Sequence, residues 1–138
     1  MISPIFAQNL EGRIVDQNKK IVGIGYNGLP TGLSDDEFPW DREGDFLKSK
    51  YAYVVHAELN AILNSITDLD SCSLYVSLFP CNECAKAIIQ SGIKEIVYED
   101  DKYAHTDSVK ASKAMLKAAG VSLRQLEECL EISLAVIE

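Results

Sequence analysis

The stretch SLYVSLFPCNECAKAIIQSGIKEIVY, residues 73–98, decides the fold. Apolar residues alternate over 73–78 and predict a strand, whereas the apolar spacing over 81–91, closed by Gly92, predicts a helix. A second β-branched run predicts another strand over 95–98. A strand, a helix and a strand in this order predict a parallel crossover within an α/β domain.

The alternation of strands and helices continues on both sides of this unit. The other predicted elements are two strands of a hairpin at 12–16 and 20–24, a helix at 56–65, a helix from Thr106 or Asp107 to Gly120, and a short strand at 121–123. This order predicts a mixed sheet of about five strands with helices on its faces. The Gly-, Pro- and Asn-containing segment 25–50 is expected to form a long loop of the functional kind, while the tail 126–137 fits a helix or a strand.

Length and composition indicate one globular domain over residues 1–138, since 47% of the residues are hydrophobic and 25% are charged. The chain has 13 Lys and Arg against 21 Asp and Glu, a net charge of -8. Because no basic face is evident, nucleic-acid polymers and anionic membranes are poor candidate partners. The N-terminus has no signal-peptide pattern and no segment is long and apolar enough to span a bilayer, so we expect a cytoplasmic protein.

Two short motifs carry the candidate chemistry, a His-x-Glu at 56–58 and a Pro-Cys-x-x-Cys at 80–84. At a helix start, Cys81 and Cys84 lie on one face of the first turn, where backbone N–H groups stabilise thiolates. His56 and Glu58 would point about 200° apart in mid-helix, so His56 must open its helix to face the cysteines. The three residues then form a zinc site with an open fourth position, beside which Glu58 acts as a proton carrier.

Two other kinds of site fit parts of this pattern. A Cys-x-x-Cys motif by itself is also typical of a thiol-redox pair. A structural zinc site would need a fourth protein ligand, and the spare residues are Cys72, His105 and Cys129, none at ligand spacing from another. As alternatives to a role as ligands, Cys72 and Cys129 fit small apolar positions and His105 fits a surface loop.

His-x-Glu followed by Pro-Cys-x-x-Cys resembles the signature of the zinc-dependent nucleobase deaminases. Within that family the chain is similar to the deoxycytidylate (dCMP) deaminases, over roughly residues 12–124. The segments that carry the similarity are Gly23 to Gly28, Ser34 to Asp36, Pro39-Trp40, Lys50-Tyr51, Tyr53-Val54, His56 to Ile62, Phe79 to Ala85, Gly92 to Glu95, and Asp101 to Tyr103. These segments include the loop before His56, which differs among deaminases of other substrates, so the resemblance indicates the deoxynucleotide branch.

The resemblance implies a three-layer αβα sandwich that hydrolyses dCMP to dUMP and ammonia in pyrimidine nucleotide metabolism. It implies one Zn²⁺ per chain on His56, Cys81 and Cys84, with Glu58 carrying the proton of the attacking water to N3 of cytosine.

The resemblance also implies a set of substrate contacts. The Ala57 N–H would donate a hydrogen bond to the pyrimidine O2, and Asn27 would bind the sugar hydroxyl. Phe79 and Tyr103 would line the pocket that holds the base. Each has a simpler alternative, because Asn27 fits a left-handed turn residue and the two aromatic residues fit ordinary packing. Four cationic residues are equal candidates for the phosphate contact, namely Arg42, Lys48, Lys50 and Lys102.

Other functions and partners remain open at this point. The alternatives to dCMP deamination are dCTP deamination by the same site and a catalytically silent, zinc-stabilised interaction domain. Several family members are hexamers, so the resemblance implies a homo-oligomer, with dCTP and dTTP as candidate effectors. The family usually opens on an amphipathic helix, and residues 1–11 leave little room for one before the hairpin, so we expect most of that helix to be missing.

Overall fold

The computed structural model describes residues 10–126 as a mixed sheet with three α-helices. The elements in chain order are β1 (Glu11–Val15), β2 (Ile21–Tyr26), the 3-10 helices η1 (Phe46–Lys48) and η2 (Lys50–Ala52), α2 (Ala57–Asn64), β3 (Ser73–Leu78), α3 (Asn82–Ser91), β4 (Glu95–Asp100), α4 (Asp107–Ala118) and β5 (Ser122–Gln125). The strand order is β2-β1-β3-β4-β5. The strand β1 is antiparallel to β2 and β3, whereas β3, β4 and β5 are parallel. The predicted α/β class, the hairpin and the parallel crossovers are confirmed.

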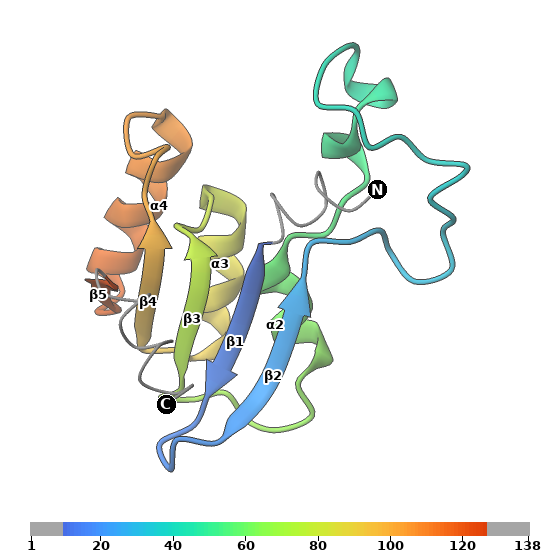
Figure 1. Cartoon of the computed structure of the whole chain (residues 1–138). Helices are drawn as coiled ribbons and strands as arrows, with labels where there is room; N and C mark the ends of the chain where they lie inside the picture. Colours follow the sequence, from blue (N-terminus) through green and yellow to red (C-terminus); the bar gives the residue numbers. More distant parts are fainter. Residues whose placement is uncertain (1–9, 127–138) are drawn as a thin grey trace, which may run out of the picture.

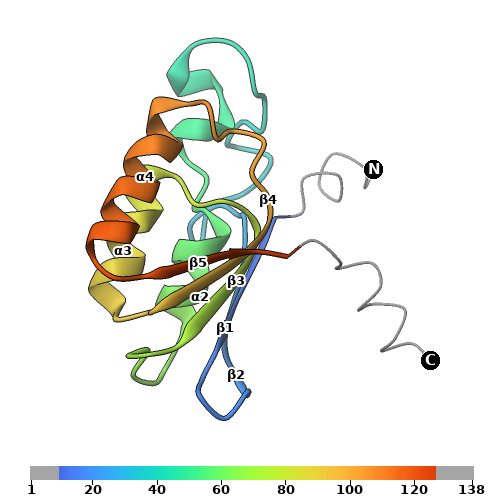
Figure 2. The same ribbon diagram turned by 90° about the vertical axis from the view of Figure 1, so that its left-hand side faces the viewer.

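The helices α2, α3 and α4 all cover the same face of the sheet (Figure 2). Residues 10–126 therefore supply two of the three expected layers, the sheet and one layer of helices. Two predictions concern segments almost wholly outside the described residues. They are the missing opening helix, at residues 1–11, and the helix or strand of the tail, at 126–137. Within 10–126, no helix has the length and apolar character that a membrane span requires.

The helix boundaries follow from capping residues. Thr106 is the N-cap of α4, as predicted, and its side chain accepts a hydrogen bond from the Val109 N–H. Gly92 ends α3 with φ 91°, a left-handed conformation that glycine adopts without strain. The start of α3 differs slightly from the prediction, because the helix begins at Asn82 and Cys81 is its N-cap.

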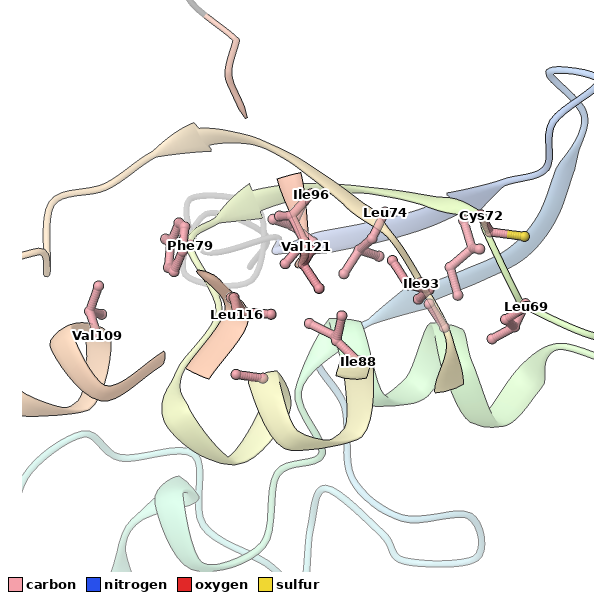
Figure 3. Close-up of a cluster of buried hydrophobic side chains, with 14 residues drawn as sticks. Leu69, Cys72, Leu74, Phe79, Ile88, Ile93, Ile96, Val109, Leu116 and Val121 are labelled. Carbon is pink, nitrogen blue, oxygen red and sulfur yellow. The ribbon is translucent and has the colours of Figure 1, made fainter. Parts of the chain in front are cut away.

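The hydrophobic core lies between the sheet and the helices (Figure 3). Ile14, Leu74 and Ile96 from three adjacent strands meet Ile88 of α3 and Leu116 of α4, and all five side chains are fully buried. Burial of such side chains is the main contribution to the free energy of folding. The core thus fixes α3 and α4 against the sheet.

The helix α2 lies close to β2 because two strand residues have no side chain. A Cβ at Gly23 or Gly25 would overlap the backbone of Ala61, and at Gly25 also that of Ala57. This close approach places the first turn of α2 directly over the end of the hairpin. The segment between β2 and α2 extends beyond the same end of the sheet (Figure 1).

Candidate active site

The candidate site lies where α2 and α3 begin. His56 is the N-cap of α2, with extended backbone angles (φ -70°, ψ 153°), so it opens the helix as predicted. Cys81 is the N-cap of α3, and its Sγ accepts a hydrogen bond from the Cys84 N–H at 3.4 Å. The two helix starts therefore bring the imidazole of His56 together with two thiols that lie 25 and 28 residues further along the chain.

The three side chains have the geometry of a metal-ligand set. Their candidate ligand atoms all lie within 4.8 Å of one another. His56 Nδ1 is 3.3 Å from Cys84 Sγ and 3.6 Å from Cys81 Sγ. Tetrahedral Zn²⁺ with bonds of about 2.05 Å to nitrogen and about 2.3 Å to sulfur holds these atoms about 3.6 Å apart. The donor types and the two N···S distances fit a zinc site.

The three side chains of the cluster shift one another's pKa, and a hydrogen bond to Cys81 raises the pKa of His56. A hydrogen bond from the Cys84 thiol, and a second from His56, lower the pKa of Cys81 to about 4. The pKa of Cys84 is raised because its thiol shares its proton with Cys81 and because it is buried. The Cys81–Cys84 pair thus favours the thiolate at Cys81, and binding of zinc would require the loss of the proton on Cys84.

Glu58 lies on the first turn of α2, two residues after His56, and is only 8% exposed. Burial raises the pKa of this carboxyl group to about 7, although the nearby His56 charge opposes the shift. A carboxyl group that titrates near neutral pH exchanges protons readily in both directions. Among residues 10–126, the cluster of possible ligands contains His56 and the two cysteines but not Glu58, Cys72 or His105.

The sequence of the site matches a known family model, the cytidine and deoxycytidylate deaminase zinc-binding region, over residues 11–100. The chain belongs to this family. The match includes the whole cluster and its helix starts, so the deaminase zinc-binding region corresponds to the place where the structure brings His56, Cys81 and Cys84 together.

Individual relatives within the deaminase family agree with this assignment. The chain is 53% identical over 122 residues to the deoxycytidylate deaminase of Homo sapiens, covering 86% of this chain and 68% of the relative. It is 54% identical over 114 residues to the Mus musculus enzyme of the same name, covering 81% and 64%. The fold is similar to the dCMP deaminase of cyanophage S-TIM5 solved with dCMP and dUMP, with a TM-score of 0.66 and 24% identity over 85% of this chain and 80% of that one.

Two of the substrate contacts expected for a deaminase are bonded to each other. Asn27 Oδ1 accepts a hydrogen bond from the Ala57 N–H at 2.8 Å. Asn27 therefore lies at the start of α2, and its φ is not positive, so it is not a left-handed turn residue. The sequence did not predict this bond. One signal for it was available, because a histidine that opens a helix and also faces a metal leaves the first N–H groups of that helix to be bonded by another residue.

The two aromatic residues expected at the base lie in different surroundings. Phe79 is 4% exposed and packs edge-on against Tyr98 with 4.7 Å between ring centroids, at the end of the core near Val109 (Figure 3). Tyr103 is 46% exposed, in the loop after β4, with the Lys102 ammonium 5.5 Å from its ring centroid. Their contacts with the base stay predictions.

A charged pair beside Phe79 had no signal in the sequence. Lys113 Nζ of α4 lies 2.6 Å from Asp101 Oδ2 and 5.1 Å from the centre of the Phe79 ring.

Two of the candidate phosphate contacts, Lys50 and Arg42, influence each other. Burial and the nearby Arg42 charge lower the pKa of Lys50, so the two side chains lie near each other.

Proposed function

We propose that the chain hydrolyses dCMP to dUMP and ammonia, with zinc held by His56, Cys81 and Cys84. The observation that carries this proposal is the 53% identity, over 86% of the chain, to proteins named deoxycytidylate deaminase. The site supports it, because a three-ligand cluster with an adjacent buried carboxyl group is the arrangement of a hydrolytic rather than a structural zinc site.

Glu58 is the proposed proton carrier of the reaction. As a carboxylate it takes one proton from the attacking water and delivers it to N3 of cytosine, while the oxygen bonds to C4. It then passes the second proton to the amino group, the C4–N bond breaks, and ammonia leaves. Bound zinc supplies the Lewis acidity that makes a water reactive at neutral pH. The raised pKa of Glu58 suits both steps.

The proposed substrate contacts surround the start of α2. The Ala57 N–H would bond the pyrimidine O2, and Asn27 would bond the sugar hydroxyl. Tyr103 is exposed and can approach a base from the loop side, whereas Phe79 would act from within the packed end of the core. These roles come from the family resemblance. Without nucleotide the Ala57 N–H donates to Asn27 Oδ1, so the pyrimidine O2 and the sugar hydroxyl would replace this bond when the nucleotide binds.

A parallel assay of four substrates tests the proposal. Ammonia release is measured for dCMP, dCTP, deoxycytidine and cytidine with the zinc content of the same sample quantified. We expect kcat/KM to be at least about tenfold higher for dCMP than for the other three, which is within the range that one buried polar contact supplies. Preference for dCTP would identify a dCTP deaminase, and a zinc-loaded sample inactive on all four would identify a silent interaction domain.

We further propose that residues 1–138 form one deaminase domain that acts as a homo-oligomer in the cytoplasm, with dCTP and dTTP as candidate effectors. Two apolar side chains, one in the last turn of α2 and one just beyond it, support the oligomer, since Leu63 is 68% exposed and Ile66 is fully exposed. Light scattering on the purified chain tests it, and a monomeric mass at micromolar concentration would refute it. The net charge of -8 argues against nucleic-acid polymers and anionic membranes as partners.

A further inference from the structure

The start of α2 lacks the usual capping arrangement. An N-cap side chain normally accepts a hydrogen bond from the first-turn N–H groups, which have no partner within the helix. His56 occupies the N-cap position and makes no side-chain cap bond. Its Nδ1 faces the two sulfur atoms instead, at 3.3 and 3.6 Å. A side chain used as a metal ligand is therefore not available to cap its own helix.

At the start of α3, one side chain serves both as the helix cap and as a proposed metal ligand. Cys81 is also an N-cap and a proposed ligand, but its sulfur accepts the Cys84 N–H while it faces His56. Sulfur has several lone pairs and can serve the helix and the metal together. The Nδ1 atom of imidazole has one lone pair, so it serves one partner at a time.

Asn27 supplies the missing cap from outside the helix. Its Oδ1 accepts the Ala57 N–H at 2.8 Å, and the N–H can only donate, so the amide must present its oxygen to the helix. Asn27 comes from the end of β2, 30 positions away in the chain. The bond ties the residue that follows His56 to the sheet.

The backbone on both sides of Asn27 is itself fixed to α2. The Asn60 amide donates to the Tyr26 carbonyl oxygen at 2.8 Å. Gly28 and Val55 exchange two backbone hydrogen bonds of 3.1 and 2.7 Å, in an antiparallel bridge that ends one residue before His56. The Asn27 side chain is thus presented from a rigid support.

We infer that Asn27 is a positioning residue for the metal site, because it caps α2 in place of His56 and so fixes the orientation in which the imidazole meets the zinc. This role rests on His56 being a zinc ligand, as in the proposed function, but it does not depend on the substrate. It is separate from the proposed sugar contact of Asn27, since it operates before any nucleotide binds. On binding, the pyrimidine O2 would take over the Ala57 N–H and so replace Asn27 as its acceptor. Groups that orient a metal ligand through a hydrogen bond to its side chain typically change metal affinity by about 10- to 100-fold when they are removed, which sets the scale for Asn27.

The test measures metal binding in the full chain without nucleotide. Zinc affinity is determined by competition with a chromophoric chelator, and the visible absorption of the Co²⁺-substituted protein reports the ligand geometry. Asn27→Ala removes the cap, Asn27→Leu removes it while keeping the side-chain volume, and Asn27→Asp keeps an acceptor oxygen. Asn64→Ala is the matched control, because it removes another side-chain bond between α2 and β2, from Asn64 Nδ2 to the Ile24 carbonyl oxygen at 3.2 Å.

We expect Asn27→Ala and Asn27→Leu to weaken zinc binding by about tenfold or more and to shift the Co²⁺ spectrum. Asn27→Asp should stay within about threefold of the unmodified chain, since a carboxylate is as good a cap as an amide. If one of the two cap-removing variants does not fold, the other decides. Unchanged zinc affinity and an unchanged Co²⁺ spectrum would overturn the inference, as would an equal loss in Asn27→Asp or Asn64→Ala. A rise in KM for dCMP with normal metal binding would leave Asn27 as a substrate contact alone.

Discussion

The Nδ1 atom of His56 lies 3.3 Å from the Sγ atom of Cys84, although 28 positions separate the two residues in the chain. The contact joins the N-cap of α2 to the first turn of α3. Both helices lie on the same face of one sheet, so the fold holds the two atoms near each other before a metal binds. A site prepared in this way loses little conformational entropy on metal binding.

Replacing the proposed proton carrier should separate metal binding from turnover. Glu58→Gln is expected to keep one zinc per chain and to lose at least about 100-fold in kcat for dCMP, the usual scale for a lost acid–base group. Glu83→Gln is the control, because Glu83 is exposed and bonds Lys86 on the surface of α3. Near-normal turnover in Glu58→Gln would show that another group carries the proton.

Removing a proposed ligand should release the metal and weaken the fold together. Cys81→Ala is expected to lose most of the bound zinc and to unfold at a lower temperature, since binding energy at such a site contributes to folding. Cys72→Ala is the matched control, because Cys72 is buried in the core away from the cluster. Its zinc content should not change, and its free energy of unfolding should fall by about 1 kcal/mol. Full zinc content in Cys81→Ala would mean that the ligand set is wrong.

The close approach of α2 to β2 predicts a strong effect at one glycine. Gly25→Ala should lower the free energy of unfolding by about 3 kcal/mol or more, because the added Cβ overlaps the backbone of Ala57 and Ala61. Gly28→Ala, whose Cβ would meet no atom of the described part of the chain within 4 Å, should change the free energy of unfolding by less than about 0.5 kcal/mol. Chemical denaturation of the two zinc-loaded variants measures the difference, and equal stability would contradict the described helix position.

One buried hydroxyl group should be dispensable. Ser112 is fully buried on α4, and its Oγ has no hydrogen-bond partner among residues 10–126. Ser112→Ala should therefore leave the free energy of unfolding unchanged or raise it by up to about 1 kcal/mol. Ser108→Ala should lower it by about 1 kcal/mol, because the Ser108 hydroxyl donates to Asn82 Oδ1 and accepts from the Asn82 N–H. The opposite order of the two variants in thermal denaturation would contradict this account of α4.

The order and type of the elements could be predicted from the sequence because the signals are local. The alternation over Ser73–Leu78 and the helix spacing closed by Gly92 lie within single segments, and the structure has both elements there. The segment 25–50 has no such period. The 3-10 helix η1 lies within it and η2 begins at its last residue, and neither was predicted. Loop structure of this kind depends on contacts with the rest of the fold.

The part of the candidate site that depends on the spacing of ligand residues along the sequence could be predicted. His56, Cys81 and Cys84 could be grouped because His56 has to open its helix and the two cysteines share one face at a helix start, and the structure brings the three together. The bond between Asn27 and Ala57 could not be predicted, since it depends on where the end of β2 lies relative to α2. The contact of Lys113 with Phe79 depends likewise on the docking of α4.

A metal titration tests most directly whether one zinc ion on His56, Cys81 and Cys84 makes the chain a dCMP deaminase. Zinc is added stepwise to the metal-free full chain, and ammonia release from dCMP is measured at each step. The rate should rise in proportion to the zinc bound and stop rising at one zinc per chain, with no rise in Cys81→Ala. Activity in the metal-free chain, or no activity with one zinc bound, would contradict the claim.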